Sequence, residues 1–218
     1  PGSSISNFLA SARREMRGRN ASAEVTTSPA IPIDASIAEL RLTLSGEIVI
    51  VGEDRDDAAA ELRVESNGFD EAEARKLAAE TTLAVSKFAD SVVAGWQFPD
   101  PGRQQPRLTL RLPRRLRVQL DGRGTATVTG MGTVPLSRTA RQVEIKTTRG
   151  AVNGEHRGGT LTIDGSRAVD LYSVSSETEI SDVLEDVRLN IRTGEGTLAG
   201  TRGVVTVTSG DATVRVNG

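Results

Sequence analysis

Hydrophobic and polar residues alternate with a period of two over most of the chain, and this pattern predicts short β-strands. In the stretch 37–44, Leu40 and Leu42 lie on one side of the predicted strand, while Arg41 lies on the other. The same alternation returns at 108–120 and continues to the end of the sequence. We therefore predict an all-β fold.

One long segment shows helical spacing instead. Asp70 followed by Glu73 matches a capping box, and Gly95 suits the residue just after a helix. We predict a helix over 70–94 that packs on the sheet, with a partner-binding helix as the alternative. Its apolar stripe consists of Ala74, Leu77, Thr81, Val85, Phe88 and Val92.

The first 32 residues form a separate predicted segment. Pro1-Gly2-Ser3 resembles the remnant of tag cleavage, so we expect the native N-terminus to lie upstream. Residues 5–17 have the spacing of a short helix, and 20–32 are rich in Ser, Thr, Ala and Pro, as is typical of a linker. We divide the rest into the helix and linker at 4–32 and a β-domain at 33–218.

A degenerate repeat marks the second half of the chain. Its frame starts at Ile145, with a threonine two residues later and glycines at five and nine residues. The frame recurs at Ile191 and more weakly at Ile163 and Val207. Short strands with glycine at recurring corners suit a β-solenoid, in which each coil buries its inner face against the next.

Composition favours this solenoid over an antiparallel sandwich or barrel, which is the main rival. Fifteen of the 22 glycines fall from Gly122 onward, and Tyr172 is the only aromatic residue after Phe98. A narrow interior filled by small branched side chains explains both facts. We predict a single-stranded β-solenoid with one inserted or packed α-helix and a short N-terminal helix.

The run 108–130 has a recognisable form: an alternating strand that ends at Pro113, a second strand, and then glycine-flanked coils. It resembles a recurring stretch of the bacterial "putative adhesin" family, a domain of unknown function, and the resemblance extends over 37–218. The resemblance implies a β-solenoid and supplies no family catalytic residue. The predicted helix at 70–94 departs from the commonest pattern of that family.

Composition excludes several kinds of chemistry. The chain has no cysteine, so it has no disulfide, thiolate metal site or cysteine nucleophile, and one histidine cannot supply a multi-histidine metal centre. That residue, His156, lies in the glycine-flanked stretch 154–159, where we expect a solvated corner side chain rather than a catalytic base. We predict no catalytic residue, no metal ligand and no cofactor.

A carbohydrate-active β-helix enzyme is the alternative from another class. It would need paired carboxylates, and sugar sites usually add aromatic platforms, which are scarce here. The candidate carboxylates have no spacing that singles out a pair; they are Asp164, Asp170, Asp182 and Asp186. An intracellular regulatory scaffold is the third alternative.

The net charge of −2 conceals four blocks: +3 over 1–20, −10 over 21–100, +9 over 101–149 and −4 over 150–218. The basic block predicts a site for an anionic envelope polymer or lipid. The alternative is a solvated face offset by acidic segments such as the turn 53–57. Nucleic acid is not expected, since stacking aromatics are absent nearby. The predicted binding residues are Arg107, Arg111, Arg114, Arg115 and Arg117.

The last strand, 212–216, still alternates, so its coil would present an open sheet edge at Val214 and Val216. We predict that a protein partner or a second copy covers this end, unless the native chain continues there. The expected function is a noncatalytic β-solenoid scaffold or adhesin-like interaction protein. We favour association with the bacterial cell envelope.

Overall fold

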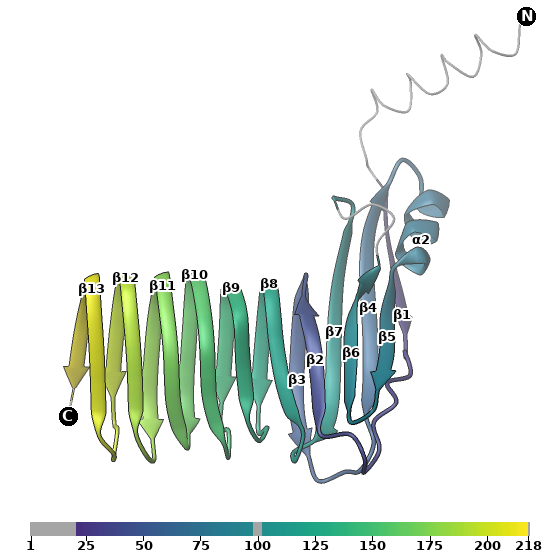
Figure 1. Cartoon of the computed structure of the whole chain (residues 1–218). Coiled ribbons are helices and arrows are strands. Elements are labelled where there is room, and N and C mark those ends of the chain that lie inside the picture. Colours follow the sequence, from purple (N-terminus) through teal and green to yellow (C-terminus); the bar gives the residue numbers. More distant parts are fainter. Residues whose placement is uncertain (1–20, 98–101, 218) are drawn as a thin grey trace, which may run out of the picture.

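A stack of parallel β-coils forms most of the molecule, as the computed structural model shows (Figure 1). The structure describes residues 21–97 and 102–217. The predicted tag remnant and the predicted helix at 5–17 lie outside these residues. Within them the all-β solenoid is confirmed, with one packed helix.

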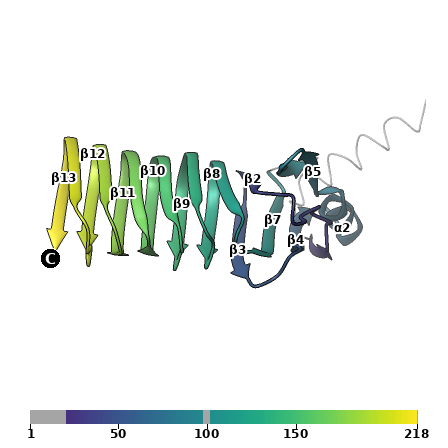
Figure 2. The same ribbon diagram turned by 60° about the horizontal axis from the view of Figure 1, so that its bottom comes forward.

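Six long strands make the coils, and each one bends at a corner so that it contributes to two faces (Figure 2). Each pairs in parallel with the next strand of the chain, in a nearly continuous register. They are β8 (Arg117–Thr129), β9 (Val134–Lys146), β10 (Ala151–Ser166), β11 (Ala168–Val183), β12 (Val187–Ala199) and β13 (Val205–Asn217).

The N-terminal strands continue the two faces separately. The first part of β8 pairs with β2 (Glu39–Leu44), and its second part pairs with β3 (Glu47–Glu53). Beyond β2 that face adds β6 (Ser91–Gln97) and β5 (Thr82–Phe88). Beyond β3 the other face adds β7 (Gln104–Pro113), β4 (Ala59–Gly68) and β1 (Ala21–Thr27).

Columns of aliphatic side chains fill the interior of the coils. One column runs from Ile145 through Ile163 and Ile180 to Leu198, and every member is at most 2% exposed. Burying one such side chain contributes about 1.5–3 kcal/mol, so stacked columns provide the main stabilisation of the coils. This confirms a core without aromatic residues in the coil stack.

The alignment of Ile145 with Ile191 is wrong as a coil repeat. Ile145 is followed in its column by Ile163, whereas Ile191 aligns with Ser173 and Ser209 on the other face. Both faces carry inward aliphatic residues followed by a corner, so a local motif recurs on either face. The structural repeat is the full coil.

The predicted helix at 70–94 is also wrong in length, because α2 spans only Glu71–Glu80. Its start is as predicted: the Asp70 side chain accepts a hydrogen bond from the Glu73 amide, at 2.8 Å, and the Glu73 carboxylate accepts one from the Phe69 amide. After it come the hairpin strands β5 and β6. Threonine and valine from residue 81 onward favour extended backbone, and the apolar positions there also fit a period of two.

Glycine is required at the corner between the two parts of β12. Gly194 has a φ of +112°, and a Cβ atom there would lie 2.1 Å from the carbonyl oxygen of Ser176 on the preceding coil. Gly196, two residues later, lies inside the coil, where a Cβ atom would make ordinary contacts of 3.4–3.6 Å with Leu189, Val214 and Ile191. A methyl group would therefore clash with backbone at position 194, whereas at position 196 it would make ordinary contacts.

We expect Gly194→Ala to lower the free energy of unfolding by at least about 2 kcal/mol, because the methyl group meets backbone and the conformation is left-handed. Gly196→Ala is the matched control and should change it by less than about 1 kcal/mol. Urea unfolding followed by circular dichroism measures both. Equal losses for the two variants would contradict the corner argument.

Candidate functional site

The predicted arginine surface is neutralised by carboxylates of adjacent strands. β3 lies between β7 and β8, and its glutamates pair with the arginines of β7. Arg107 lies 3.2 Å from Glu47, its direct cross-strand partner, and Arg111 lies 2.7 Å from Glu53. These exposed pairs contribute little stability, but they lower the positive charge of the surface.

Hydrogen bonding to the Arg111 guanidinium holds the pKa of the Glu53 carboxyl below its usual range, with Arg55 adding to the effect. Glu53 is therefore ionised at neutral pH and offsets the charge of Arg111. The acidic turn at 53–57 lies against the basic block, as the alternative interpretation expected.

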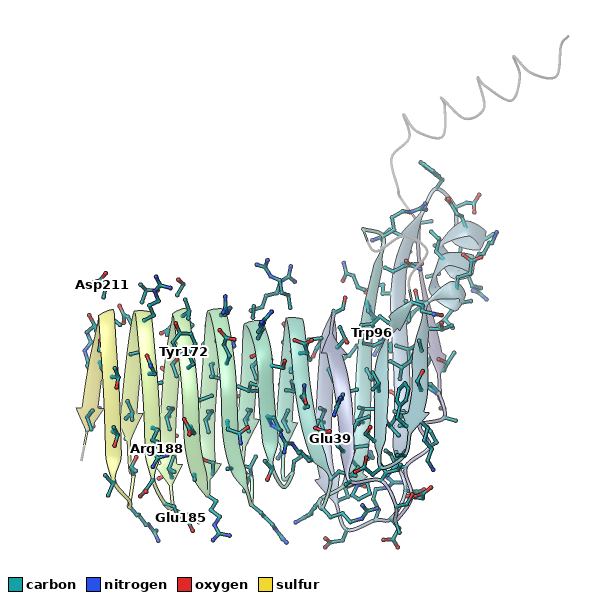
Figure 3. All side chains as sticks on the ribbon, viewed as in Figure 1. Glu39, Trp96, Tyr172, Glu185, Arg188 and Asp211 are labelled. Carbon is teal, nitrogen blue, oxygen red and sulfur yellow. The ribbon has the colours of Figure 1, made fainter. Side chains whose placement is uncertain are left out.

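The remaining three predicted arginines also have partners. Arg117 lies 3.4 Å from Glu39, labelled in Figure 3, and Arg114 lies 3.6 Å from Asp54. Arg115 donates hydrogen bonds of 2.7 Å to the backbone carbonyls of residues 34 and 37, so it anchors that turn. Arg107 and Arg111 lie on β7, Arg114 and Arg115 in the turn that follows, and Arg117 at the start of β8, so the five are spread along the chain rather than around one recess.

A groove of about 680 Å³ lies where the N-terminal strands meet the coils. β4 and β7 extend beyond the coil stack and form one wall (Figure 1), while the corners of β8 and β9 contribute Arg123 and Arg141. Register places these two arginines on adjacent strands, since Gly124 pairs with Arg141. Across the described ranges 21–97 and 102–217, neither arginine forms an ion pair, so both charges face the groove uncompensated by direct contact.

The last coil, β13, leaves one edge of the sheet open (Figure 2). Its inward residues Val205, Val207 and Val214 are only partly buried, and Val216 is 57% exposed. Leu198, which pairs with Val216 and holds the equivalent position in β12, is fully buried. Val216 thus exposes apolar surface at a position that holds a buried aliphatic residue in the preceding coils: Leu198, Ile180, Ile163 and Ile145.

His156 is not the solvated corner residue that the sequence suggested. It is fully buried inside β10, with Nδ1 3.0 Å from Oγ1 of Thr139 on the preceding coil, and Nε2 has no hydrogen-bond partner among the residues that the structure describes. Burial lowers its pKa to about 4. The signal was present in the sequence, because Val152, Gly154 and His156 share one parity and therefore one face.

Hydroxyl groups continue this polar column in the next coil. Ser173 pairs with His156 in the register, and its hydroxyl bonds to those of Ser176 and Thr178, the latter at 2.8 Å. All three residues are buried. The cluster satisfies itself inside the coil and offers no group to the surface.

The structure brings two of the four candidate carboxylates of the enzyme hypothesis into one groove and places the other two elsewhere. Asp170 and Asp186 line a shallow surface groove of about 540 Å³ together with Arg188. Asp182 lines another groove, and Asp164 accepts a hydrogen bond of 2.9 Å from Ser181. Asp186 also accepts a bond from the Val204 amide, which fixes the turn before β13.

Among residues 21–97 and 102–217, no helix has both the length and the hydropathy of a membrane-spanning segment. The same residues contain no group of three or more histidine, aspartate or glutamate side chains arranged to hold a metal ion.

No family model matches the chain, and no curated protein sequence matches it. Solved structures are similar to it at low identity. A putative cell adhesion protein from Clostridium sporogenes is 8% identical, covers 90% of this chain and 99% of its own, and has a TM-score of 0.40. A putative adhesin from Bacteroides fragilis is 11% identical, with coverages of 89% and 97% and a TM-score of 0.40.

A putative lipid binding protein from Parabacteroides distasonis is 10% identical, with coverages of 89% and 96% and a TM-score of 0.35.

We expect the buried His156 to make the free energy of unfolding decrease as the pH is lowered. The unfolded chain takes up a proton near pH 6.5, while the folded chain resists until about pH 4, so stability is complete above pH 6.5 and declines below it. Between about pH 7.5 and about pH 5 the loss should be about 2 kcal/mol. Urea unfolding at the two pH values measures it.

His156→Gln is the control, because glutamine retains polar groups for Thr139 and does not titrate in this range. Carboxylates with lowered pKa, such as Glu53 and Glu73, act at lower pH and affect both proteins equally. An unchanged pH dependence in His156→Gln would show that another group is responsible.

Proposed function

We propose that this protein is a noncatalytic, adhesin-like interaction scaffold that associates with the bacterial cell envelope. One observation carries the proposal: among residues 21–97 and 102–217, the last strand of the in-register stack, β13, has an unpaired edge, and its inward residues are partly or largely exposed. Open edges with apolar side chains are surfaces that proteins normally cover or pair. Binding through this end uses the fold itself and requires no reactive group.

A second contact surface supports the envelope part of the proposal. Arg123 and Arg141 lie side by side at the groove between the coils and the N-terminal strands, without ion-pair partners in the described ranges. Phosphate groups of envelope lipids or polymers are suitable ligands for such arginines. The five arginines predicted from the sequence remain a wider candidate surface, but each has a partner within the chain.

We expect the chain to co-sediment with vesicles that contain phosphatidylglycerol and not with vesicles of phosphatidylcholine alone. Substitution of both Arg123 and Arg141 by serine should weaken binding about tenfold, because each removes an uncompensated charge near the phosphate groups. Binding should also fall with increasing salt.

The charge-matched control replaces Arg111 and Arg117, which are already paired with Glu53 and Glu39, by serine. It should weaken binding only slightly. A larger effect of this control would assign the lipid contact to the surface predicted from the sequence. Absence of vesicle binding would remove anionic lipid from the proposal, and the same variants can then be tested with polyphosphate.

We expect the chain to associate in a concentration-dependent way across the micromolar range, because association buries the open coil of β13. Val216→Lys should reduce this association by placing a charge at the edge. Leu184→Lys is the matched control, since Leu184 is equally exposed, at 57%, but lies between β11 and β12. Sedimentation velocity measures the three proteins, and a strict monomer would contradict association through this end.

A further inference from the structure

The exposed edge of β13 is complementary in charge to its own antiparallel copy. Its second part reads Asp211-Ala-Thr-Val-Arg215, with one acid and one base placed symmetrically about Thr213. Asp211, Thr213 and Arg215 are exposed, whereas Ala212 and Val214 face the core and are partly buried. Figure 3 shows Asp211 at one corner of the last coil.

Antiparallel pairing about a two-fold axis at Thr213 would oppose each charge to its opposite. Asp211 of one copy would lie across from Arg215 of the other, and the symmetry creates this pair twice. The inward residues would match as well, because Ala212 would lie across from Val214 of the other copy. Charged residues would remain outside and apolar residues inside on both chains.

The same axis suits the other face of the coil. The corner glycine of β12, Gly194, pairs with Ala212 of β13, and on the first part of β13 Val207 pairs with the buried Leu189. The two-fold arrangement would also bring the first parts of β13 in the two copies edge to edge, with Val205 and Val207 inside the coil. Both faces of the solenoid would then continue across the contact, and the partly buried valines would gain the cover that their counterparts in β12 already have.

The charge symmetry of β13 favours contact between like ends. The opposite end of the solenoid carries the antiparallel strands β1 and β5 with helix α2, which packs on β1 and β4. Among residues 21–97 and 102–217, that end has no coil that spans both faces and matches the edge of β13. Pairing of like ends about a two-fold axis is closed, so it gives a dimer and not a fibre.

We propose that the β13 edge is the interface of a closed, two-fold symmetric dimer, with a second copy of this chain as its partner and Asp211–Arg215 pairs between the copies. This proposal rests on the proposed interaction function and names the partner of that same surface. Within one chain Arg215 lies 3.9 Å from Glu195, and both side chains are about two-thirds exposed. Such a weak pair leaves the guanidinium available to a second copy.

Charge reversal tests the register. Asp211→Arg alone places two arginines across from each other, and Arg215→Asp alone places two aspartates across from each other. Each should raise the dimer dissociation constant at least about tenfold, because two attractive pairs become repulsive. The double variant Asp211→Arg/Arg215→Asp should restore the wild-type constant, since it recreates both pairs in reverse.

Mixing the two single variants should give a heterodimer that is tighter than either homodimer. Analytical ultracentrifugation measures the constants, and circular dichroism with urea unfolding checks that the exposed substitutions leave each chain folded. Equal weakening by the singles, the double and the mixture would overturn the two-fold register. A different result is that the wild type associates, Val216→Lys abolishes the association, and the charge reversals have no effect. That result would support association through the edge and overturn the proposed register. A monomeric wild type overturns both.

Discussion

The in-register hydrogen bonding of each coil to the next is the interaction on which the whole structure depends. It places equivalent residues of successive coils above one another, so that Ile145, Ile163 and Ile180 form a buried column. No coil could bury its inner face alone, because that face is covered only by its neighbours. The same register brings Thr139 and His156 together, and it fixes which groups face the interior and which face outward.

The coil stack was predictable because its signals are local: alternation with a period of two, glycines at corners, and few aromatic residues. The extent of α2 was not, since the residues after Glu80 fit both a helical stripe and two strands. Tertiary pairing of β6 with β2 decided the outcome in favour of strands. The burial of His156 could have been predicted, because it shares the even-numbered positions of Val152 and Gly154 and therefore their face of the strand. The glycines on either side suggested a corner instead.

The candidate sites, too, were predictable only where their signals are local in the sequence. The arginines of β7 and β8 were visible in the sequence, but their neutralisation was not. It depends on two strands from far upstream: β3 brings Glu47 and Glu53 beside the arginines of β7, and β2 brings Glu39 beside Arg117 of β8. Arg123 was not among the binding residues predicted from the sequence. It becomes a candidate because the fold places it beside Arg141 at a groove. Charge in a sequence therefore indicates surface character only after strand order is known.

Because each coil adds one strand to the stack, the number of coils sets the distance between surfaces at its two ends. The arginine groove and the β13 edge lie at opposite ends of the parallel stack, and each coil between them adds one strand spacing of about 4.8 Å. Duplication or deletion of a whole coil would change the separation of these two surfaces in steps of that size and would leave both unaltered. Insertion of a single residue within a strand would instead turn the following side chains to the wrong face. Related chains can therefore vary in reach only by whole coils.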